Sequence, residues 1–132
     1  MISKDYVEEL FKFLETGEND KFFVKVSDNV NWTVMGTHPL AGTYKTKKDF
    51  MINTFQRLNR VLKEGVILRV KYILVNDNTA VVEMESLSTA INGKPFNNTY
   101  CWIVNFENGI IINVRAYVDS ALVKRVLDEN ET

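Results

Sequence analysis

The sequence predicts an α+β fold, in which a cone-shaped, curved antiparallel or mixed sheet wraps around helices. Two observations lead to this prediction. Apolar residues recur at helical spacing mainly in the first half of the chain and at its C-terminal end. The second half instead carries long strand-like segments joined by tight turns. Helices segregated to one side of an antiparallel sheet are typical of this class, and long strands joined by short turns would curl into a half-open cone.

The N-terminal part of the chain predicts two helices followed by a strand. Ser3 can cap the first helix, and Gly17 would end it. A short second helix starts at residue 19 or 20. Residues 27–29 have turn chemistry, and residues 30–35 are rich in the β-branched residues that favour a strand.

A loop rich in glycine and proline, over residues 36–42, precedes the longest predicted helix. Thr46 can cap this helix, Asp49 completes a capping box in its carboxylate variant, and Gly65 would end it. A short closing helix is predicted over residues 120–127.

Four strands in a meander fill the second half of the chain. They are predicted over residues 66–75, 79–91, 95–106 and 110–119. Asn92-Gly93 and Asn108-Gly109 are dipeptides that favour the positive backbone angles of tight hairpins. The meander therefore has hairpin turns of known chemistry at two of its connections.

The last strand has two chemically different faces. The apolar face carries Ile110, Ile112, Val114, Ala116 and Val118, and the other face carries Ile111, Asn113, Arg115, Tyr117 and Asp119. An ionised carboxylate is costly in a dry core unless it has a partner. We therefore expect the apolar face to pack against a second copy of the chain, and the polar face to curl around a small cavity.

Composition excludes several classes of function. With 132 residues, of which 45% are hydrophobic and 25% charged, the chain fits one domain over residues 1–132. A formal net charge of −1 gives no basic field for nucleic acid or anionic lipid. The single cysteine, Cys101, excludes an intramolecular disulfide. Because neither a membrane span nor a signal segment is evident, we expect a cytoplasmic protein.

Three segments resemble motifs of the SnoaL-like polyketide cyclases. Their W-x-x-x-G and P-x-x-G-x-Y pattern is similar to NWTVMGTHPLAGTY (31–44). Their N-G-x-x-x-x-N-x-Y strand entry is similar to NGKPFNNTY (92–100), and their R-E-Y-x-D strand end to RAYVD (115–119). The similarity keeps its order over nearly the whole chain.

The resemblance carries expectations for both fold and site. The family belongs to the nuclear transport factor 2-like and ketosteroid isomerase-like superfamily, which implies a cystatin-like conical α+β barrel with an apolar pocket. It implies a homodimer through the outer face of the sheet, and Asp119 as the acid or base in the pocket. Ala116 stands where the family usually has Glu, which makes the face assigned to the partner more adhesive.

Three residues are candidates for catalysis, each with a structural alternative. Burial in an apolar cone would raise the pKa of Asp119, or Asp119 could instead pair with Arg115 or cap the closing helix. Tyr117 could donate a hydrogen bond to substrate, or to a backbone carbonyl. His38, the one histidine in the sequence, could gate or protonate a substrate, or could be an exposed loop residue.

The candidates for ligand binding are mostly aromatic. They are Trp32, Phe55, Tyr72, Trp102 and Arg115. Aromatic rings can stack against a flat ligand, or can be plain core. No spacing of His, Cys, Asp or Glu suggests a metal site, and no glycine-rich phosphate loop suggests a nucleotide, so no cofactor is expected.

The sequence thus predicts a small-molecule pocket protein, of the cofactor-independent isomerase, cyclase or hydratase type. It would use general acid/base catalysis on an apolar carbonyl-containing ligand. The alternative is a non-catalytic ligand-binding or dimerisation module of the same fold. An enzyme predicts a cavity of a few hundred Å³ with Asp119 at its wall, whereas the module predicts that aromatic side chains fill the cone.

Overall fold

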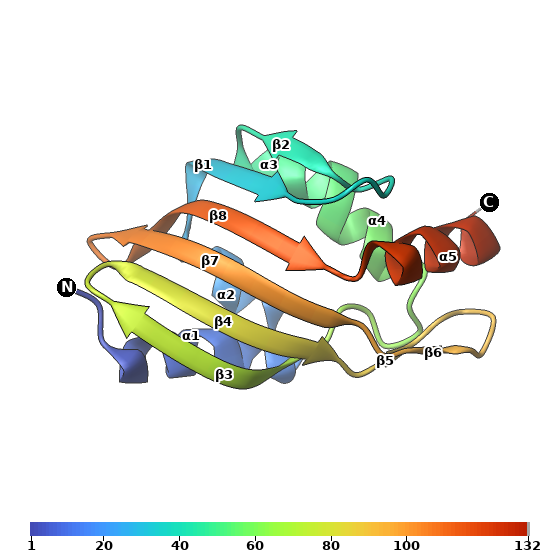
Figure 1. The fold of residues 1–132 in the computed structure, drawn as a ribbon, viewed down its shortest axis with the longest axis horizontal. Helices are drawn as coiled ribbons and strands as arrows, with labels where there is room; N and C mark the ends of the chain where they lie inside the picture. The colour runs from blue at the N-terminus through green and yellow to red at the C-terminus, as the bar shows by residue number, and fades with distance from the viewer. Residues whose placement is uncertain (132) are drawn as a thin grey trace.

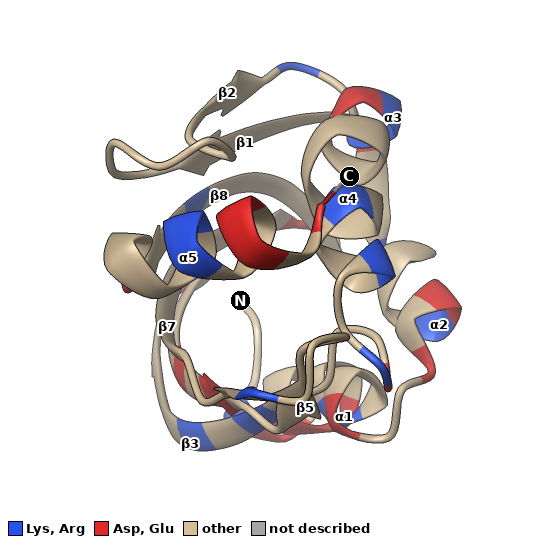
Figure 2. Ribbon diagram, turned by 90° about the vertical axis from the view of Figure 1, so that its right-hand side faces the viewer, with Lys and Arg blue, Asp and Glu red and all other residues tan. Residues whose placement is uncertain are grey.

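A six-stranded mixed sheet curls around helices in the structure of the chain, a computed structural model that describes residues 1–131. The strand order is β2-β1-β8-β7-β4-β3. Figure 1 shows the helices α1 and α2 behind the sheet and α5 beyond the end of β8. Seen from that end, the strands curve around the interior (Figure 2). The predicted α+β class is confirmed.

The elements have the following bounds. The helices are α1 (Lys4–Glu15), α2 (Asn19–Phe23), α3 (Lys47–Phe50), α4 (Gln56–Arg60) and α5 (Ser120–Asn130), with a π-helical turn, η1 (Met51–Phe55), joining α3 to α4. The strands are β1 (Val26–Val34), β2 (Gly42–Tyr44), β3 (Leu68–Asn76), β4 (Thr79–Ser86), β5 (Ser88–Thr89), β6 (Pro95–Phe96), β7 (Thr99–Glu107) and β8 (Ile110–Val118). Strands β5 and β6 form a separate two-stranded hairpin.

The predicted helix starts are correct, because their capping chemistry is local. The Ser3 hydroxyl accepts the N–H of Tyr6 at 3.1 Å, and the Thr46 hydroxyl accepts the N–H of Asp49 at 3.1 Å. The predicted turn between β7 and β8 is also confirmed. Asn108 and Gly109 have φ angles of 53° and 78°, which is the left-handed pair that a tight hairpin requires.

Two predictions of local structure are wrong, and one strand was not predicted. Residues 27–29 are not a turn but part of β1, where the register with β8 is irregular between Val26 and Asn31. The short strand β2 was not predicted and pairs with β1. The helix that starts after Thr46 is interrupted by η1, and a π turn of this kind is frequent near functional sites.

The predicted faces of β8 are also wrong. Asn105 pairs with Asn113 and Phe106 with Ile111, so Ile112 is an extra, bulged residue. The bulge allows both Ile111 and Val114 to point into the core. Ala116 is buried as well, while Arg115 and Tyr117 point outward. The interior therefore receives the apolar side chains, and the face with Arg and Tyr meets solvent.

Aromatic rings occupy much of the cone. Trp32 stacks on Phe50 with 3.9 Å between ring centroids, and meets Trp102 edge-on at 5.1 Å. The ring centroids of Phe23 and Phe55 are 4.9 Å apart, again in an edge-to-face arrangement. These contacts bring the sheet and the helices of residues 47–60 together. Among the described helices, none has the length and hydrophobicity that a bilayer span requires.

Candidate functional site: a cavity inside the cone

The cone contains a small, half-open apolar cavity of about 60 Å³. Its wall is made of Trp32, Val34, His38, Leu40, Phe50, Thr54, Phe55, Leu58, Val66, Leu68, Tyr100, Trp102, Ala116, Val118 and Val123. The sheet and the helices of residues 47–60 supply most of these residues, and α5 contributes Val123. A water molecule needs roughly 10–15 Å³ of such volume, so the cavity has room for a few small atoms.

Three side chains that line this cavity each carry a buried polar atom with no hydrogen-bond partner within the described chain. These atoms are Trp32 Nε1, Thr54 Oγ1 and Tyr100 Oη. Buried polar groups in folded proteins are nearly always paired, because an unpaired one forfeits its hydration. The cavity therefore combines apolar walls with unused hydrogen-bonding capacity, the usual composition of a small-molecule site.

Each of these polar side chains comes from a different element. Trp32 lies on β1, and Tyr100 lies on β7 on the same inward face as Trp102. Thr54 lies on the π turn η1, which also brings its neighbour Phe55 onto the cavity wall. Three elements that are distant in sequence thus bring polar side chains to the wall of one apolar space.

Tyr100 stays protonated in this environment. Burial raises the pKa of its phenol far above the usual value, because the phenolate would lose its hydration. The hydroxyl is therefore available to donate a hydrogen bond at any physiological pH. Neither Tyr100 nor Thr54 was predicted from the sequence, although Tyr100 is the last residue of the 92–100 motif.

His38 lies on the cavity wall and is 6% exposed, so the alternative of an exposed loop histidine is wrong. Its Nδ1 accepts the N–H of Leu40 at 3.1 Å, which leaves the proton on Nε2. Nε2 then donates to the carbonyl oxygen of Met35 at 3.1 Å. Burial lowers the pKa of His38, more than the bond to Met35 raises it. The side chain is therefore a neutral imidazole with both nitrogens engaged.

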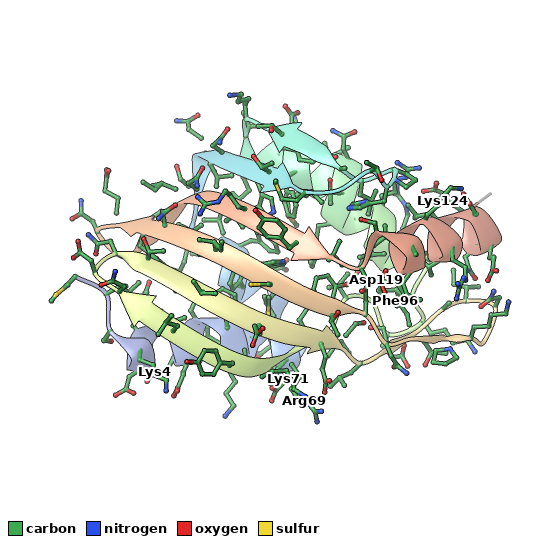
Figure 3. The ribbon with its side chains drawn as sticks, viewed as in Figure 1. Lys4, Arg69, Lys71, Phe96, Asp119 and Lys124 are labelled. Atoms are coloured by element: carbon green, nitrogen blue, oxygen red, sulfur yellow. The ribbon has the colours of Figure 1, made fainter. Side chains whose placement is uncertain are left out.

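Asp119 caps α5. Its carboxylate accepts the N–H of Ala121 at 3.1 Å and of Leu122 at 3.5 Å, and the residue is exposed. It does not belong to the cavity wall, contrary to the predicted placement. Figure 3 shows Asp119 at the junction between β8 and α5. Proton transfer by Asp119 stays a prediction, and the geometry supports the alternative capping role.

Three other predicted site residues lie on the outside of the sheet. Tyr117 is 42% exposed and Tyr72 is 55% exposed, and Arg115 points the same way. Tyr72 is outward because a bulge between Val70 and Tyr72 shifts the register of β3. Trp32, Phe55 and Trp102 do line the cavity, and their contact with a ligand stays a prediction.

Asn98, which was not predicted as a site residue, fixes the N-terminus of α5. The residue is fully buried, and its Oδ1 accepts the N–H of Asp119 at 3.2 Å. Its Nδ2 donates to the carbonyl oxygen of Asp119 at 3.4 Å. One carboxamide, directly before the strand that carries Tyr100, therefore holds the junction between β8 and α5.

Within residues 1–131, no cluster of three or more His, Cys, Asp or Glu side chains is arranged to hold a metal ion.

Comparisons with known proteins agree with this architecture. No family model matches the sequence. The chain is 28% identical over 134 residues to the dimerizing cyclase phiC of a fungal species (strain ATCC 74256), covering 98% of this chain and 59% of that protein. It is 31% identical over 102 residues to the dimerizing cyclase tstC of Talaromyces stipitatus, covering 74% of this chain and 45% of that protein. The chain thus spans only about half the length of these relatives.

Solved structures support the fold independently of sequence. An NTF2-like protein from Burkholderia thailandensis superposes with a TM-score of 0.78 at 19% identity, covering 93% of this chain and 95% of the other. At this identity the similarity establishes the fold alone. The chain therefore has the NTF2-like fold that its SnoaL-like motifs imply, and its sequence is similar to those of the two dimerizing cyclases.

Proposed function

We propose that the chain is a small-molecule pocket protein of the cyclase or isomerase type, acting without a cofactor on an apolar carbonyl-containing ligand. The observation that carries this proposal is the apolar cavity with three unpaired polar atoms on its wall. The names of the two cyclase relatives support the reaction class.

The chemistry would depend on hydrogen bonding in a dry site. A carbonyl oxygen that gains negative charge during enolisation or ring closure is stabilised by donors aimed at it. Tyr100 supplies such a donor, and the aromatic walls exclude water, which strengthens each hydrogen bond. The other titratable side chain on the cavity wall is His38, whose Nδ1 would become a proton acceptor when its bond to the Leu40 N–H opens.

A panel of cyclic ketones and enones tests the proposal. Binding is followed by tryptophan fluorescence, and conversion by chromatography with mass spectrometry. Ala116→Leu fills the cavity from its wall, and Arg115→Leu places the same side chain on the outer face as a matched control. We expect at least one compound to bind and be converted, with both effects lost only in Ala116→Leu. Equal behaviour of the two variants would contradict the proposal.

The second candidate is a non-catalytic ligand-binding or dimerisation module. The volume of about 60 Å³ favours it, since it falls short of the few hundred Å³ expected of a substrate site, and aromatic rings fill much of the cone. The panel separates the two candidates. Binding without conversion of any compound would favour the module.

We also propose that the chain forms a homodimer through the outer face of the sheet. Apolar side chains from three strands gather there, including Leu74, Val81 and Ile103, which pair across β3, β4 and β7. Within the described chain, no helix covers this face (Figure 1). These residues replace the set from β8 that the sequence analysis assigned to the interface. This apolar patch shares the face with Arg115 and Tyr117, and an uncovered apolar patch favours association.

Light scattering at micromolar concentration tests the dimer. Leu74→Lys should shift the mass toward that of a monomer, because it places a charge inside the interface. Leu87→Lys is a matched control, since Leu87 is also an exposed leucine and lies outside the strands of the large sheet. A monomeric unmodified protein would contradict the proposal.

A further inference from the structure

We infer that the cavity selects an uncharged ligand through its carbonyl oxygen, and that Trp32, Thr54 and Tyr100 determine this specificity. The inference rests on the proposed function, and it adds which side chains recognise the ligand and which charge the ligand has. It replaces the predicted Asp119 with neutral donors as the polar element of the site.

The first step is the location of the unpaired atoms. The described chain has six buried side-chain nitrogen or oxygen atoms without a hydrogen-bond partner. Three of them, on Trp32, Thr54 and Tyr100, belong to the wall of this one cavity. Asn19 and Asn31, which lie elsewhere, still use their amide nitrogens in hydrogen bonds to Val66 and Asn113. The clustering therefore marks the cavity as a place where a partner from outside the chain is expected.

The second step is the chemistry of these atoms. The indole Nε1–H of Trp32 can only donate, while the hydroxyls of Thr54 and Tyr100 can donate or accept. A ligand must therefore present at least one acceptor, because otherwise the indole stays unpaired. A carbonyl oxygen has two lone pairs and can accept two of these donors at once.

The third step is charge. The wall as described contains no Asp, Glu, Lys or Arg, and His38 is held as a neutral imidazole by its two hydrogen bonds. An anionic ligand would lose its hydration in this cavity without gaining an opposite charge, and so would a cation. The site is therefore complementary to a neutral oxygen acceptor.

Three small probes of the same branched shape test the inference. They are 2-butanone, propionate and 2-methylbutane, which present a carbonyl oxygen, a carboxylate and no polar atom. Their size suits a cavity of about 60 Å³. The main readout is the indole N–H signal of Trp32 in ¹H–¹⁵N spectra. The sequence has two tryptophans, so Trp102→Phe assigns the two signals.

We expect 2-butanone to move the signal of the Trp32 indole proton downfield, as a new hydrogen bond does. The alkane 2-methylbutane should cause no such downfield shift. Tyr100→Phe should weaken the binding of 2-butanone about threefold to tenfold, which corresponds to one neutral hydrogen bond, without weakening the binding of 2-methylbutane. Thr54→Val should act in the same direction. Tyr117→Phe is the matched control, because it removes the same hydroxyl from the outer face.

The outcomes separate this inference from the proposed function. The inference is overturned if propionate binds as tightly as 2-butanone, or if Tyr100→Phe weakens the ketone and the alkane equally, although the cavity would then still be a ligand site. If none of the three probes binds, the cavity takes no ligand of this size, and the proposed function falls with the inference.

Discussion

Replacing Tyr100 by phenylalanine should make the protein more stable. The substitution removes one buried oxygen that has no hydrogen-bond partner in the described chain, and leaves the ring in place. Leaving such a group unpaired costs about 1–3 kcal/mol. Since the cavity is large enough for water to recover part of this cost, we expect a gain of about 1 kcal/mol in the free energy of unfolding. For a domain of this size the melting temperature would rise by about 3–5 °C.

Urea denaturation followed by tryptophan fluorescence measures this change. The m-value should stay constant, because the surface exposed on unfolding is nearly the same. Tyr117→Phe is the control, and its effect should lie within about 0.5 kcal/mol, as for other exposed positions. A loss of more than about 1 kcal/mol in Tyr100→Phe would refute the reasoning. It would mean that the hydroxyl already has a partner in the folded protein, and is not free for a ligand.

Four further predictions address the pH dependence and the start of α5. Because burial raises the pKa of the Tyr100 phenol, the folded protein keeps a proton that the unfolded chain loses above about pH 10. The free energy of unfolding should therefore fall above that pH, and fall less steeply in Tyr100→Phe. Equal slopes of the free energy against pH in the two proteins would contradict this. The pKa of His38 is lowered, so the free energy of unfolding should fall as the pH drops below about 6.5. Urea denaturation at a series of pH values checks this, since the fall should be absent in His38→Asn. Asp119→Ala should cost about 1 kcal/mol through the lost cap and Asp119→Asn much less, since Asn is also a good cap; abolished turnover in a well-folded Asp119→Asn protein would instead favour proton transfer. Asn98→Ala should cost at least about 2 kcal/mol by thermal unfolding, because it leaves the N–H and the carbonyl of Asp119 without their partner, and a neutral effect would show that the junction is held otherwise.

Local signals explain which elements of the fold were predictable. Ser3 and Thr46 cap helices through contacts only three residues away, and Asn108-Gly109 adopts the turn that its own backbone preferences favour. The α+β class followed from these signals and from the spacing of apolar residues. None of them requires knowledge of a distant part of the chain.

The errors arose where pairing between distant strands decides the outcome. A bulge at Ile112 depends on β7, and the bulge before Tyr72 depends on β4, so strict alternation assigned the wrong faces to both strands. Asp119, Tyr117 and Arg115 were expected in the cavity for another reason, because the apolar face of β8 was assigned to a partner subunit; the structure instead has Ala116 and Val118 there. Tyr100 was not recognised as a site residue, because an unpaired phenol becomes visible only when its surroundings are known.

The double hydrogen bond of Asn98 has a mechanical consequence. Asn98 holds the peptide at which α5 begins, and Tyr100 follows two positions later, in β7. A displacement of α5 would therefore also displace the backbone that carries this phenol. The position of α5 and that of the Tyr100 phenol are thus coupled through Asn98, and a substitution that moves α5 would move this phenol as well.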